Sequence, residues 1–368
     1  MPTVLVDLLQ STGTKGGIEI YAQELYRHIG RMNSRYEFVG YGSRELMSTD
    51  TSWFPGEVVD SRISGENRLS WAVGELFAVS RAARKAGVDL IHCPAMFAPL
   101  RSRIPVVVSV HDLLYFSHPE LMRTPFFTEP VKWMEKRAAA TATRMITISQ
   151  FSARAIARYL DVSSDKLTVI PLAGRSMPPA AETSSVVVRE HDLFLSVGQR
   201  SPYKDFETIV RAWALIEEHQ RPRLVITGSH GDDPLIALVG ELGLERWVDL
   251  RSWISSSDLA SLFSESTALI DATLASGFSM PTLEAMTVGL PVLLADTEVF
   301  REVGGDAADY FTAGNPASLS RAVMMLVGDR HRRESLSTSG RERSATYSWT
   351  RVAEQTLAVF DLAISPEI

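Results

Sequence analysis

The sequence predicts an α/β protein made of two doubly wound domains that face each other across a cleft. Three observations support this fold class. Strand-like apolar runs alternate with helical segments along the whole chain, as in parallel sheets covered by helices. The 368 residues suffice for two domains of ordinary size. A segment rich in Pro, Ser and Ala, residues 173–185, interrupts the alternation once and reads as an interdomain linker.

We expect the first domain to cover residues 1–175. Helical segments at Trp71–Ala86 and Val131–Ala142 separate its apolar runs. Ligands of such sheets bind at the carboxyl ends of the strands, so the loops that follow these strands are the candidate binding loops. The expected strands are Thr3–Leu9, Tyr36–Tyr41, Val88–His92, Val106–Val110 and Met145–Ile148.

We expect the second domain to cover residues 186–345 and a last segment, residues 346–368, to form a helix. That helix carries apolar residues at helical spacing from Trp349 to Phe360, and so large an apolar face must dock; the first domain is where we place it. The strands expected in the second domain are Leu193–Val197, Arg223–Thr227, Val248–Arg251, Ala268–Asp271 and Val292–Ala295.

Composition indicates a cytoplasmic protein of globular type. Apolar residues make up 45% of the chain and charged residues 22%, and the single cysteine, Cys93, excludes an intramolecular disulfide. The first residues read as a strand and not as a signal peptide, and no apolar run reaches the ~18 residues of a membrane span. The net charge of −7 is uneven: residues 1–175 hold 21 Lys+Arg and 17 Asp+Glu, so the remainder carries −11. Either the first domain meets an anionic partner or its basic helices are solvated faces.

The segment SGFSMPTLEAMTVGLPV, residues 276–292, is the most informative part of the chain. A glycine turn leads into a helix that we expect to begin at Pro281, which has no amide hydrogen to lose. The next amides, of Thr282 and Leu283, would then be free to bind an anion at the helix tip. Glu284 would accept bonds from two vicinal hydroxyls. The plain alternative is an ordinary βαβ helix that starts with proline.

Two loops of the first domain carry candidate binding residues. Gly16 and Gly17 follow the first strand and precede a helix, an arrangement that lets the backbone approach a phosphate. His111 and Asp112 follow the apolar strand 106–110. There His111 would donate a hydrogen bond to a substrate hydroxyl, or stabilise developing positive charge with its own carbonyl. The alternatives are a plain glycine-rich turn, and an aspartate that caps a helix beside a satisfied histidine.

The loop after the first strand of the second domain, in SVGQRSPYKDF, residues 196–206, holds two cations. Arg200 and Lys204 would clamp a diphosphate and stabilise it as a leaving group, unless they are simply surface cations. Competing motifs are missing: the sequence has no D-x-D, no H-E-x-x-H, no C-x-x-C, no G-x-S-x-G and no G-x-G-x-x-G. We therefore expect no metal and no nicotinamide cofactor.

Taken in order, these motifs resemble the retaining glycosyltransferases of family four, which have the two-Rossmann-domain GT-B architecture. The resemblance runs nearly end to end. It includes the GG loop, HDLLYF at 111–116, ITISQFS at 146–152, VIPLAG at 169–174, VGQRSPYKDF, the 276–292 segment, FREVGGDAADYF at 300–311 and the final SWTRVAEQTL, which in this fold crosses back onto the first domain.

The resemblance implies a role for each matching position. Gly16 and Gly17 would lie against the donor diphosphate, and His111 would touch the donor sugar near its hydroxymethyl group. Lys204 would bind the diphosphate, with Arg200 in place of the arginine usually found one position earlier, where this chain has Gln199. Glu284 would hold the ribose hydroxyls. The remaining donor-binding positions are Ser276, Gly277, Phe278 and Ser279, which would line the sugar, and Thr282 and Leu283, which would bind phosphate through their amides.

One departure concerns the sugar. The family usually has a glutamate eight positions before the ribose glutamate, and this chain has Ser276. In the family that glutamate contacts a hydroxyl of the donor sugar. A short neutral side chain at the position suits a sugar that lacks this hydroxyl, is oriented differently or is contacted through water.

The resemblance implies transfer of a hexosyl unit (mannosyl, glucosyl, N-acetylhexosaminyl or rhamnosyl-type) from a nucleoside-diphosphate sugar to an acceptor hydroxyl, with retention and without metal. The acceptor would be a glycan or a lipid-linked glycan of bacterial surface polysaccharide or glycolipid synthesis. A peripheral contact with the inner face of the plasma membrane would involve residues 123–140. The alternatives are an epimerase or hydrolase of the same fold, a nucleotide-sugar-binding partner without activity, and a nicotinamide oxidoreductase.

Overall fold

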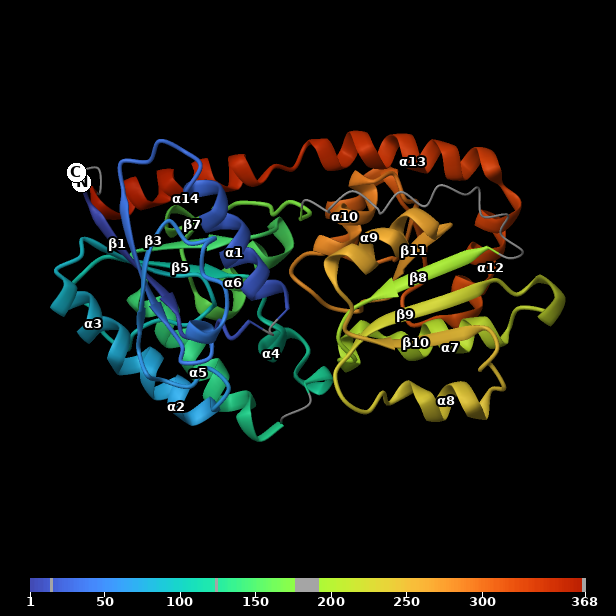
Figure 1. Cartoon of the computed structure of the whole chain (residues 1–368), viewed down its shortest axis with the longest axis horizontal. Coiled ribbons are helices and arrows are strands. Elements are labelled where there is room, and N and C mark those ends of the chain that lie inside the picture. The colour runs from blue at the N-terminus through green and yellow to red at the C-terminus, as the bar shows by residue number, and fades with distance from the viewer. Residues whose placement is uncertain (14–15, 123–124, 176–191, 366–368) are drawn as a thin grey trace. The chain divides into compact units, whose positions relative to one another are not determined.

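The computed structural model describes residues 1–13, 16–122, 125–175 and 192–365. Most of the expected linker, residues 176–185, lies outside these ranges. The chain forms two compact units: Met1–Pro119, Thr124–Leu172 and Ser348–Ile368 make the first, and Glu120–Arg123 with Ala173–Tyr347 the second. Residues 173–175 thus belong with the second unit and residues 348–368 with the first (Figure 1).

The first unit contains a parallel sheet in the order β3-β2-β1-β4-β5-β6-β7. The chain runs outward from β1 to β3 and then returns to the other side of β1, so the strand order reverses between β1 and β4. This reversal is where open α/β sheets bind their ligands. The strands are β1 (Thr3–Leu8), β2 (Glu37–Gly42), β3 (Gly56–Asp60), β4 (Leu90–Cys93), β5 (Val106–Val110), β6 (Arg144–Thr147) and β7 (Leu167–Val169).

Helices cover both faces of this sheet (Figure 1). Because both faces are covered, β4 and β5 are buried along their whole length and consist mostly of apolar residues. The helices are α1 (Gly17–Ile29), α2 (Arg68–Val73), the π-turn Gly74–Ala78, α3 (Val79–Ala86), α4 (Leu114–Ser117), α5 (Pro125–Thr141), α6 (Gln150–Leu160) and α14 (Trp349–Ile364).

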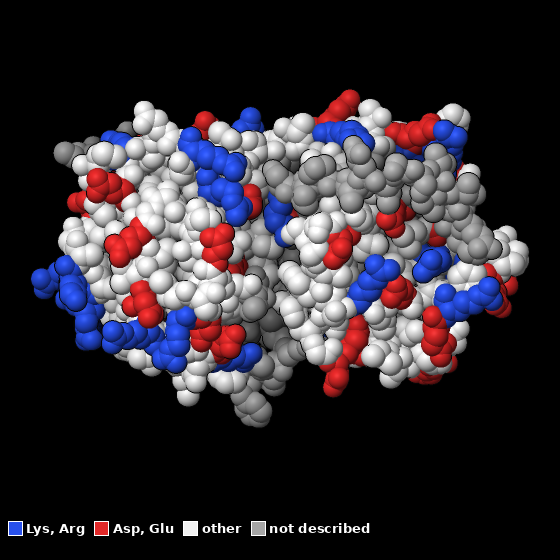
Figure 2. Space-filling model, viewed as in Figure 1, with Lys and Arg blue, Asp and Glu red and all other residues white. Residues whose placement is uncertain are grey.

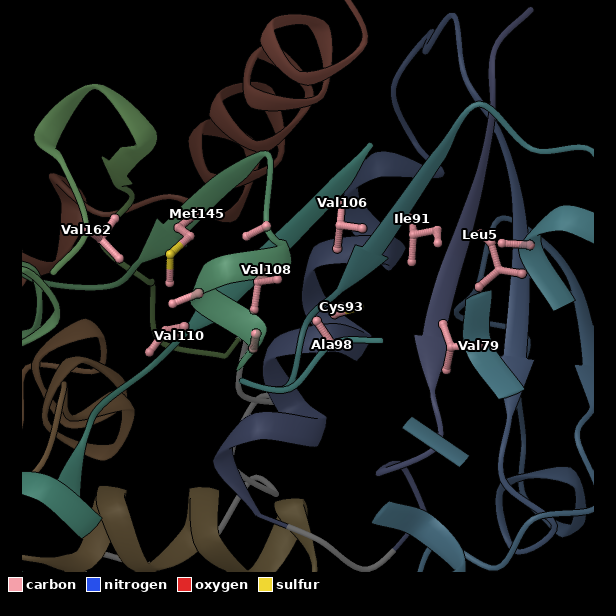
Figure 3. Close-up of a cluster of buried hydrophobic side chains, with 14 of the residues drawn as sticks. Leu5, Val79, Ile91, Cys93, Ala98, Val106, Val108, Val110, Met145 and Val162 are labelled. Atoms are coloured by element: carbon pink, nitrogen blue, oxygen red, sulfur yellow. The ribbon is translucent and has the colours of Figure 1, made fainter. Parts of the chain in front are cut away.

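One core cluster fills the space between the sheet and α3, α5 and α6 (Figure 3). Alternate strand residues such as Ile91 and Cys93 supply it, because successive side chains of a strand point to opposite faces. On the helical side, Val79 and Ile156 pack against these strand residues.

The other face is covered by α1 and α14, the helix expected from the final apolar pattern. Trp349 lies near Tyr21, with ring centroids 6.3 Å apart. Phe360 is fully buried and meets the edges of His92 and Tyr36 at 5.1 and 5.8 Å. Residues more than 300 positions from the first strand therefore complete the core of the first unit.

The second unit has a parallel sheet in the order β10-β9-β8-β11-β12-β13, which reverses between β8 and β11. Its strands are β8 (Leu193–Val197), β9 (Arg223–Ser229), β10 (Val248–Ser252), β11 (Ala268–Asp271), β12 (Val292–Ala295) and β13 (Asp309–Phe311). Its helices are α7 (Phe206–Ala214), α8 (Leu235–Glu241), α9 (Ser256–Glu265), α10 (Met280–Thr287), α11 (Glu298–Gly304), α12 (Pro316–Gly328) and α13 (Arg330–Ala345).

The expected long strands agree closely with these elements, and four of them have the bounds that the sequence indicates: β5, β8, β11 and β12. Three strands, β3, β7 and β13, were not expected from the sequence; they are edge strands of three to five residues with little buried apolar surface. The stretch 71–86, expected as one helix, is interrupted by the π-turn. The predicted α/β fold with two parallel sheets is confirmed.

Replacing Phe360 tests whether α14 belongs to the core of the first unit. We expect Phe360→Ala to lower the free energy of unfolding of this unit by about 3–5 kcal/mol, because a fully buried ring leaves a cavity. Leu362→Ala on the same helix, at a side chain that is 40% exposed, is the matched control and should cost far less. Urea unfolding followed by fluorescence measures both, and equal losses would contradict the packing.

Candidate functional site

The loop from β11 to α10 is ordered by a chain of side-chain hydrogen bonds. Ser279 is the N-cap of α10 and donates through Oγ to Asp271 Oδ2 at 2.9 Å. The Ser279 Oγ in turn accepts from the backbone N and the Oγ1 of Thr282, at 3.3 and 2.9 Å. Asp271, the last residue of β11, also binds Thr273 through the backbone amide at 3.2 Å. The carboxylate thus fixes the loop to the strand end.

This capping corrects two details of the sequence-based picture. The helix begins at Met280 and not at Pro281, with Ser279 as its cap. The amide of Thr282, which we expected to be free for phosphate, is bound by the cap. Ser276 donates to the carbonyl of Phe278 at 3.0 Å, so its hydroxyl offers a ligand only its lone pairs.

Glu284 lies in α10, buried and paired with Arg175. Its Oε1 accepts from Arg175 Nε at 2.6 Å, and its Oε2 from Nη2 at 3.3 Å. The carboxylate is therefore already held by a bidentate contact, and a pentose hydroxyl would share it with the guanidinium.

Gly174 makes this pairing possible. A Cβ on Gly174 would lie 2.9 Å from the backbone nitrogen of Glu284 and 3.0 Å from the carbonyl carbon of Leu283. Neither backbone atom can move away from a side chain there. The glycine of the VIPLAG motif is thus required by the close approach of residues 173–175 to α10.

Arg200 makes contacts in the structure that the sequence did not lead us to expect. It is buried, and its five N–H groups are all used inside the second unit. Nε and Nη2 bind Asp233, the latter at 2.8 Å, and the rest of the fork binds backbone carbonyls at 3.0 Å. The accepting carbonyls are those of Gly198, Thr227 and Ile226. Arg200 therefore ties together the ends of β8 and β9 and has no donor left for a diphosphate.

Lys204, in contrast, remains available. It ends the short 3-10 turn Pro202–Lys204 after β8 and is partly buried, with its stem beside Gly198. Among the residues that the structure describes, no hydrogen bond or ion pair involves its ammonium group. The neighbouring Tyr203 accepts through its carbonyl from the amide of Leu274 at 2.8 Å, so this turn contacts the β11–α10 loop directly. A free cation therefore stands beside the capped loop.

His111 follows β5 in the first unit and is buried. Its Nε2 must donate to the carbonyl of Pro94, at 2.9 Å, since a carbonyl only accepts. Burial lowers the pKa of His111 to about 4, so the ring is neutral near pH 7. Its Nδ1 then presents a lone pair, which can accept a hydrogen bond, whereas we expect a donor from the sequence. Its own carbonyl is occupied by Ser152 Oγ at 2.9 Å.

The glycine loop after β1 starts α1, with Gly16 as N-cap and Gly17 as the first helical residue. Residues 14–15 lie outside the described part of the chain. Glu19, which the sequence analysis missed, accepts from the amides of Thr12 at 3.2 Å and Gly13 at 2.8 Å. Part of the loop therefore already binds a carboxylate of its own chain, while the first-turn amides of α1 point along the helix axis.

Three buried acids of the first unit, Glu135, Asp7 and Glu75, were also missed. Glu135 in α5 is buried, and both of its carboxyl oxygens lack a hydrogen-bond partner in the described structure. Burial and the nearby Asp112 raise the pKa of Glu135 to about 9. Near neutral pH Glu135 is therefore a protonated acid. It lies near Asp112, the residue that follows His111.

Asp7 and Glu75 form the other acidic pair. Burial raises the pKa of both carboxyls, and that of Glu75 well above its usual range because Asp7 adds its charge. Glu75 Oε1 accepts from the indole of Trp71 at 2.9 Å. Burial of both carboxyls at the carboxyl end of β1 therefore disfavours two negative charges there. No periodic signal in the sequence marks these buried acids, because an acid within an apolar segment reads as solvated.

Two features of the described residues bear on other classes of protein. No described group of three or more His, Cys, Asp or Glu side chains is arranged to hold a metal ion. No helix in the described ranges combines the length and hydropathy that crossing a bilayer requires.

Comparison with known proteins gives the family. A model described as "Glycosyl transferases group 1" matches residues 182–343, and one described as "Glycosyltransferase Family 4" matches residues 15–173. Together they span most of the chain, so the protein belongs to the family-four, group 1 glycosyltransferases, which have the GT-B fold. It is a glycosyltransferase.

Individual relatives share about a quarter of their residues with this chain. The chain is 26% identical to the O-antigen chain mannosyltransferase B of Escherichia coli over 74% of each protein. It is 26% identical to the MMP alpha-(1->4)-mannosyltransferase of Mycolicibacterium hassiacum over 87% of this chain and 79% of that protein. It is 25% identical to a phosphatidyl-myo-inositol mannosyltransferase of Propionibacterium freudenreichii over 88% of this chain and 85% of that protein.

Solved structures agree in fold. Sucrose-phosphate synthase from Thermosynechococcus elongatus superposes with a TM-score of 0.80 at 18% identity and covers 98% of both chains. The Anabaena protein HepE in complex with UDP-glucose gives 0.77 at 17% identity and covers 98% of this chain and 99% of its own.

Arg200 can be tested as a structural residue. We expect Arg200→Ala to destabilise the second unit by about 3–5 kcal/mol, because it leaves the buried Asp233 without its partner. The double change Arg200→Ala with Asp233→Ala should recover part of this loss, since no unpaired charge remains. Thermal unfolding measures both. An unchanged melting temperature in the single variant would contradict the structural role and favour a ligand-binding role for Arg200.

Glu135 predicts a pH effect of known sign. Its folded pKa of about 9 lies above the ordinary value of 4.5, so the folded state holds a proton that the unfolded state loses. Stability from this group is complete below pH 4.5 and declines as the pH rises toward 9. We expect Glu135→Met to stabilise the first unit by about 1–3 kcal/mol more at pH 8 than at pH 5. Glu129→Met, at an exposed site of the same helix, should show no such difference in denaturant titrations.

Proposed function

We propose that the protein transfers a hexosyl unit, with retention, from a nucleoside-diphosphate sugar to an acceptor hydroxyl, in bacterial surface polysaccharide or glycolipid synthesis. The observation that carries the proposal is the pairing of a free cation, Lys204, with the capped loop and first turn of α10. They follow β8 and β11, the two strands between which the order of the second sheet reverses. This is where α/β sheets bind phosphate groups.

Each residue of this half-site has a chemical part in the proposal. The Lys204 ammonium stabilises the charge that grows on the leaving diphosphate. The amides at the start of α10 contribute the positive end of the helix. Glu284 accepts from the pentose hydroxyls while it shares its charge with Arg175. Arg200 acts indirectly, because it holds the strand ends from which the Lys204 turn projects.

In this proposal no protein carboxylate attacks the sugar and no metal or other cofactor takes part. The leaving diphosphate takes the acceptor proton on the same face of the sugar, so the configuration is retained. The first unit binds the acceptor, a glycan or lipid-linked glycan, and His111 accepts from a sugar hydroxyl through its Nδ1. The names of three relatives make a mannosyl donor the first to test.

A substitution of Lys204 tests the donor site without disturbing the fold. We expect Lys204→Met to lower kcat/KM by about 100-fold or more, on the scale of losing one donor to a developing anion. Its melting temperature should change little, since the ammonium group makes no contact in the described structure. Arg211→Ala, at an exposed cation of α7, is the matched control. The measurement is nucleotide release from GDP-, UDP- and TDP-hexoses with an acceptor panel.

Glu284→Gln extends the same experiment and keeps the shape of the side chain. It should also lose about 100-fold, because the neutral amide is a weaker acceptor for the pentose. Near-normal transfer in both variants would contradict the site. Donor consumption without acceptor would favour a hydrolase or epimerase, and donor binding without turnover would favour a binding partner. A melting-temperature screen against free nucleotides identifies the base, since a bound ligand stabilises the folded state.

A further inference from the structure

The helical stretch Arg68–Ala86, formed by α2, the π-turn and α3, has an unusual outer surface. Its inner side packs normally. Val79 and Ala83 enter the main core of the first unit, and Trp71 and Leu76 pack against the cluster around Phe97. The outer side carries large apolar side chains and cations, where a solvated helix would mix charges of both signs. We call the following residues the outer stripe: Arg68, Leu69, Val73, Phe77, Arg81, Arg84 and Lys85.

The apolar members of the outer stripe are four residues apart, so they lie on one side of the stretch. Leu69 is 76% exposed, Val73 59% and Phe77 53%. A single exposed apolar residue needs no explanation, but three in a row along one helix edge form a contiguous patch.

The charges of the outer stripe all have one sign. Glu75, the only acid in the stretch, is buried against the Trp71 indole and contributes nothing to the surface. No ion pair of the described residues involves Arg81, Arg84 or Lys85. Figure 2 shows Lys and Arg gathered along the edge of the first unit where Figure 1 places α3 and α2.

The patch continues onto α5. The Arg68 guanidinium lies over the Phe127 ring at 5.0 Å, and Phe127 is itself exposed. Phe127, which lies in the segment expected from the sequence to contact a membrane, therefore supplies the edge of the surface. The outer stripe on α2 and α3 supplies most of it.

We propose that the outer stripe docks the first unit onto an anionic lipid bilayer. Leu69, Val73 and Phe77 enter the boundary between headgroups and acyl chains, while the cations bind lipid phosphates. Within α2, the π-turn and α3, exposed apolar side chains stand beside Lys and Arg and no exposed acid, which is the surface that interfacial helices present to such membranes. Docking would hold the enzyme at the surface where a lipid-linked acceptor lies, but vesicle binding itself does not depend on the proposed transfer.

A second copy of the chain is the other candidate occupant, and the charges disfavour it. A two-fold interface brings the same patch of both subunits together. The four cations of one stripe would then face those of the other without an acidic partner on α2 or α3. An anionic bilayer satisfies the apolar residues and the cations at once.

The test is co-sedimentation of the full chain with vesicles. We expect binding to vesicles of phosphatidylcholine mixed with phosphatidylglycerol, weak binding to phosphatidylcholine alone, and loss at high salt because exposed charges are screened. The triple variant Leu69→Ser, Val73→Ser and Phe77→Ser should bind at least ~10-fold more weakly, since three apolar side chains no longer insert. Arg81→Glu with Arg84→Glu should lose ~10-fold or more, from two cations reversed.

Matched controls lie in the second unit. Ile236→Ser with Met325→Ser removes two apolar residues that are 63% and 72% exposed, and should leave vesicle binding unchanged. All variants should keep the melting temperature and its increase with nucleotide, which separates this proposal from the donor site. Wild-type protein that ignores anionic vesicles, or a triple variant that binds them as well as wild type, would overturn the proposal. So would a concentration-dependent dimer that the triple variant abolishes in sedimentation velocity.

Discussion

The burial of both sheets on both faces is the constraint on which the rest of this structure depends. A parallel strand that is covered on each side exposes backbone groups and polar side chains only at its ends. Binding chemistry is therefore confined to the loops beyond the carboxyl ends of the strands, and above all to the positions where the strand order reverses. The GG loop follows β1, and the Lys204 turn and the start of α10 follow β8 and β11.

The charged side chains of the candidate site differ in whether another group of the protein binds them. Arg200 with Asp233 and Arg175 with Glu284 are paired and hold loops in place. In each pair the guanidinium group donates its hydrogen bonds to groups of the protein and not to a ligand. Lys204 is the contrasting case, since its cation has no protein partner in the described structure. In a site that must bind an anion, the free cation is a stronger candidate than the buried one, because a buried and fully bonded guanidinium would have to break its own contacts first.

The family motifs were readable because each depends on local backbone chemistry. Glycine and proline punctuate the β11–α10 loop, and the position of Glu284 in its helix follows from them. Gly174 was noticed only as part of a motif, and its reason, contact with the backbone of α10, needed coordinates. Glu19, Glu135 and the Asp7–Glu75 pair gave no signal, because sequence periodicity treats an acid as solvated unless its neighbours in space are known. The direction of the His111 hydrogen bond also depended on a distant atom, the carbonyl of Pro94.

By itself, the sequence determined the fold class, the long central strands, the final apolar helix and the membership of the glycosyltransferases. The first three follow from periodicity and turn residues within short windows of chain, whereas the membership follows from the resemblance of the motifs taken in order. Only the tertiary structure decided which charges are free. Arg200 and Lys204 are four residues apart and equal in formal charge, yet one is enclosed by three carbonyls and an aspartate and the other is not. It also decided that Leu69, Val73 and Phe77 face outward, because burial depends on what packs against a helix, and a helical pattern alone does not say which side the core will take.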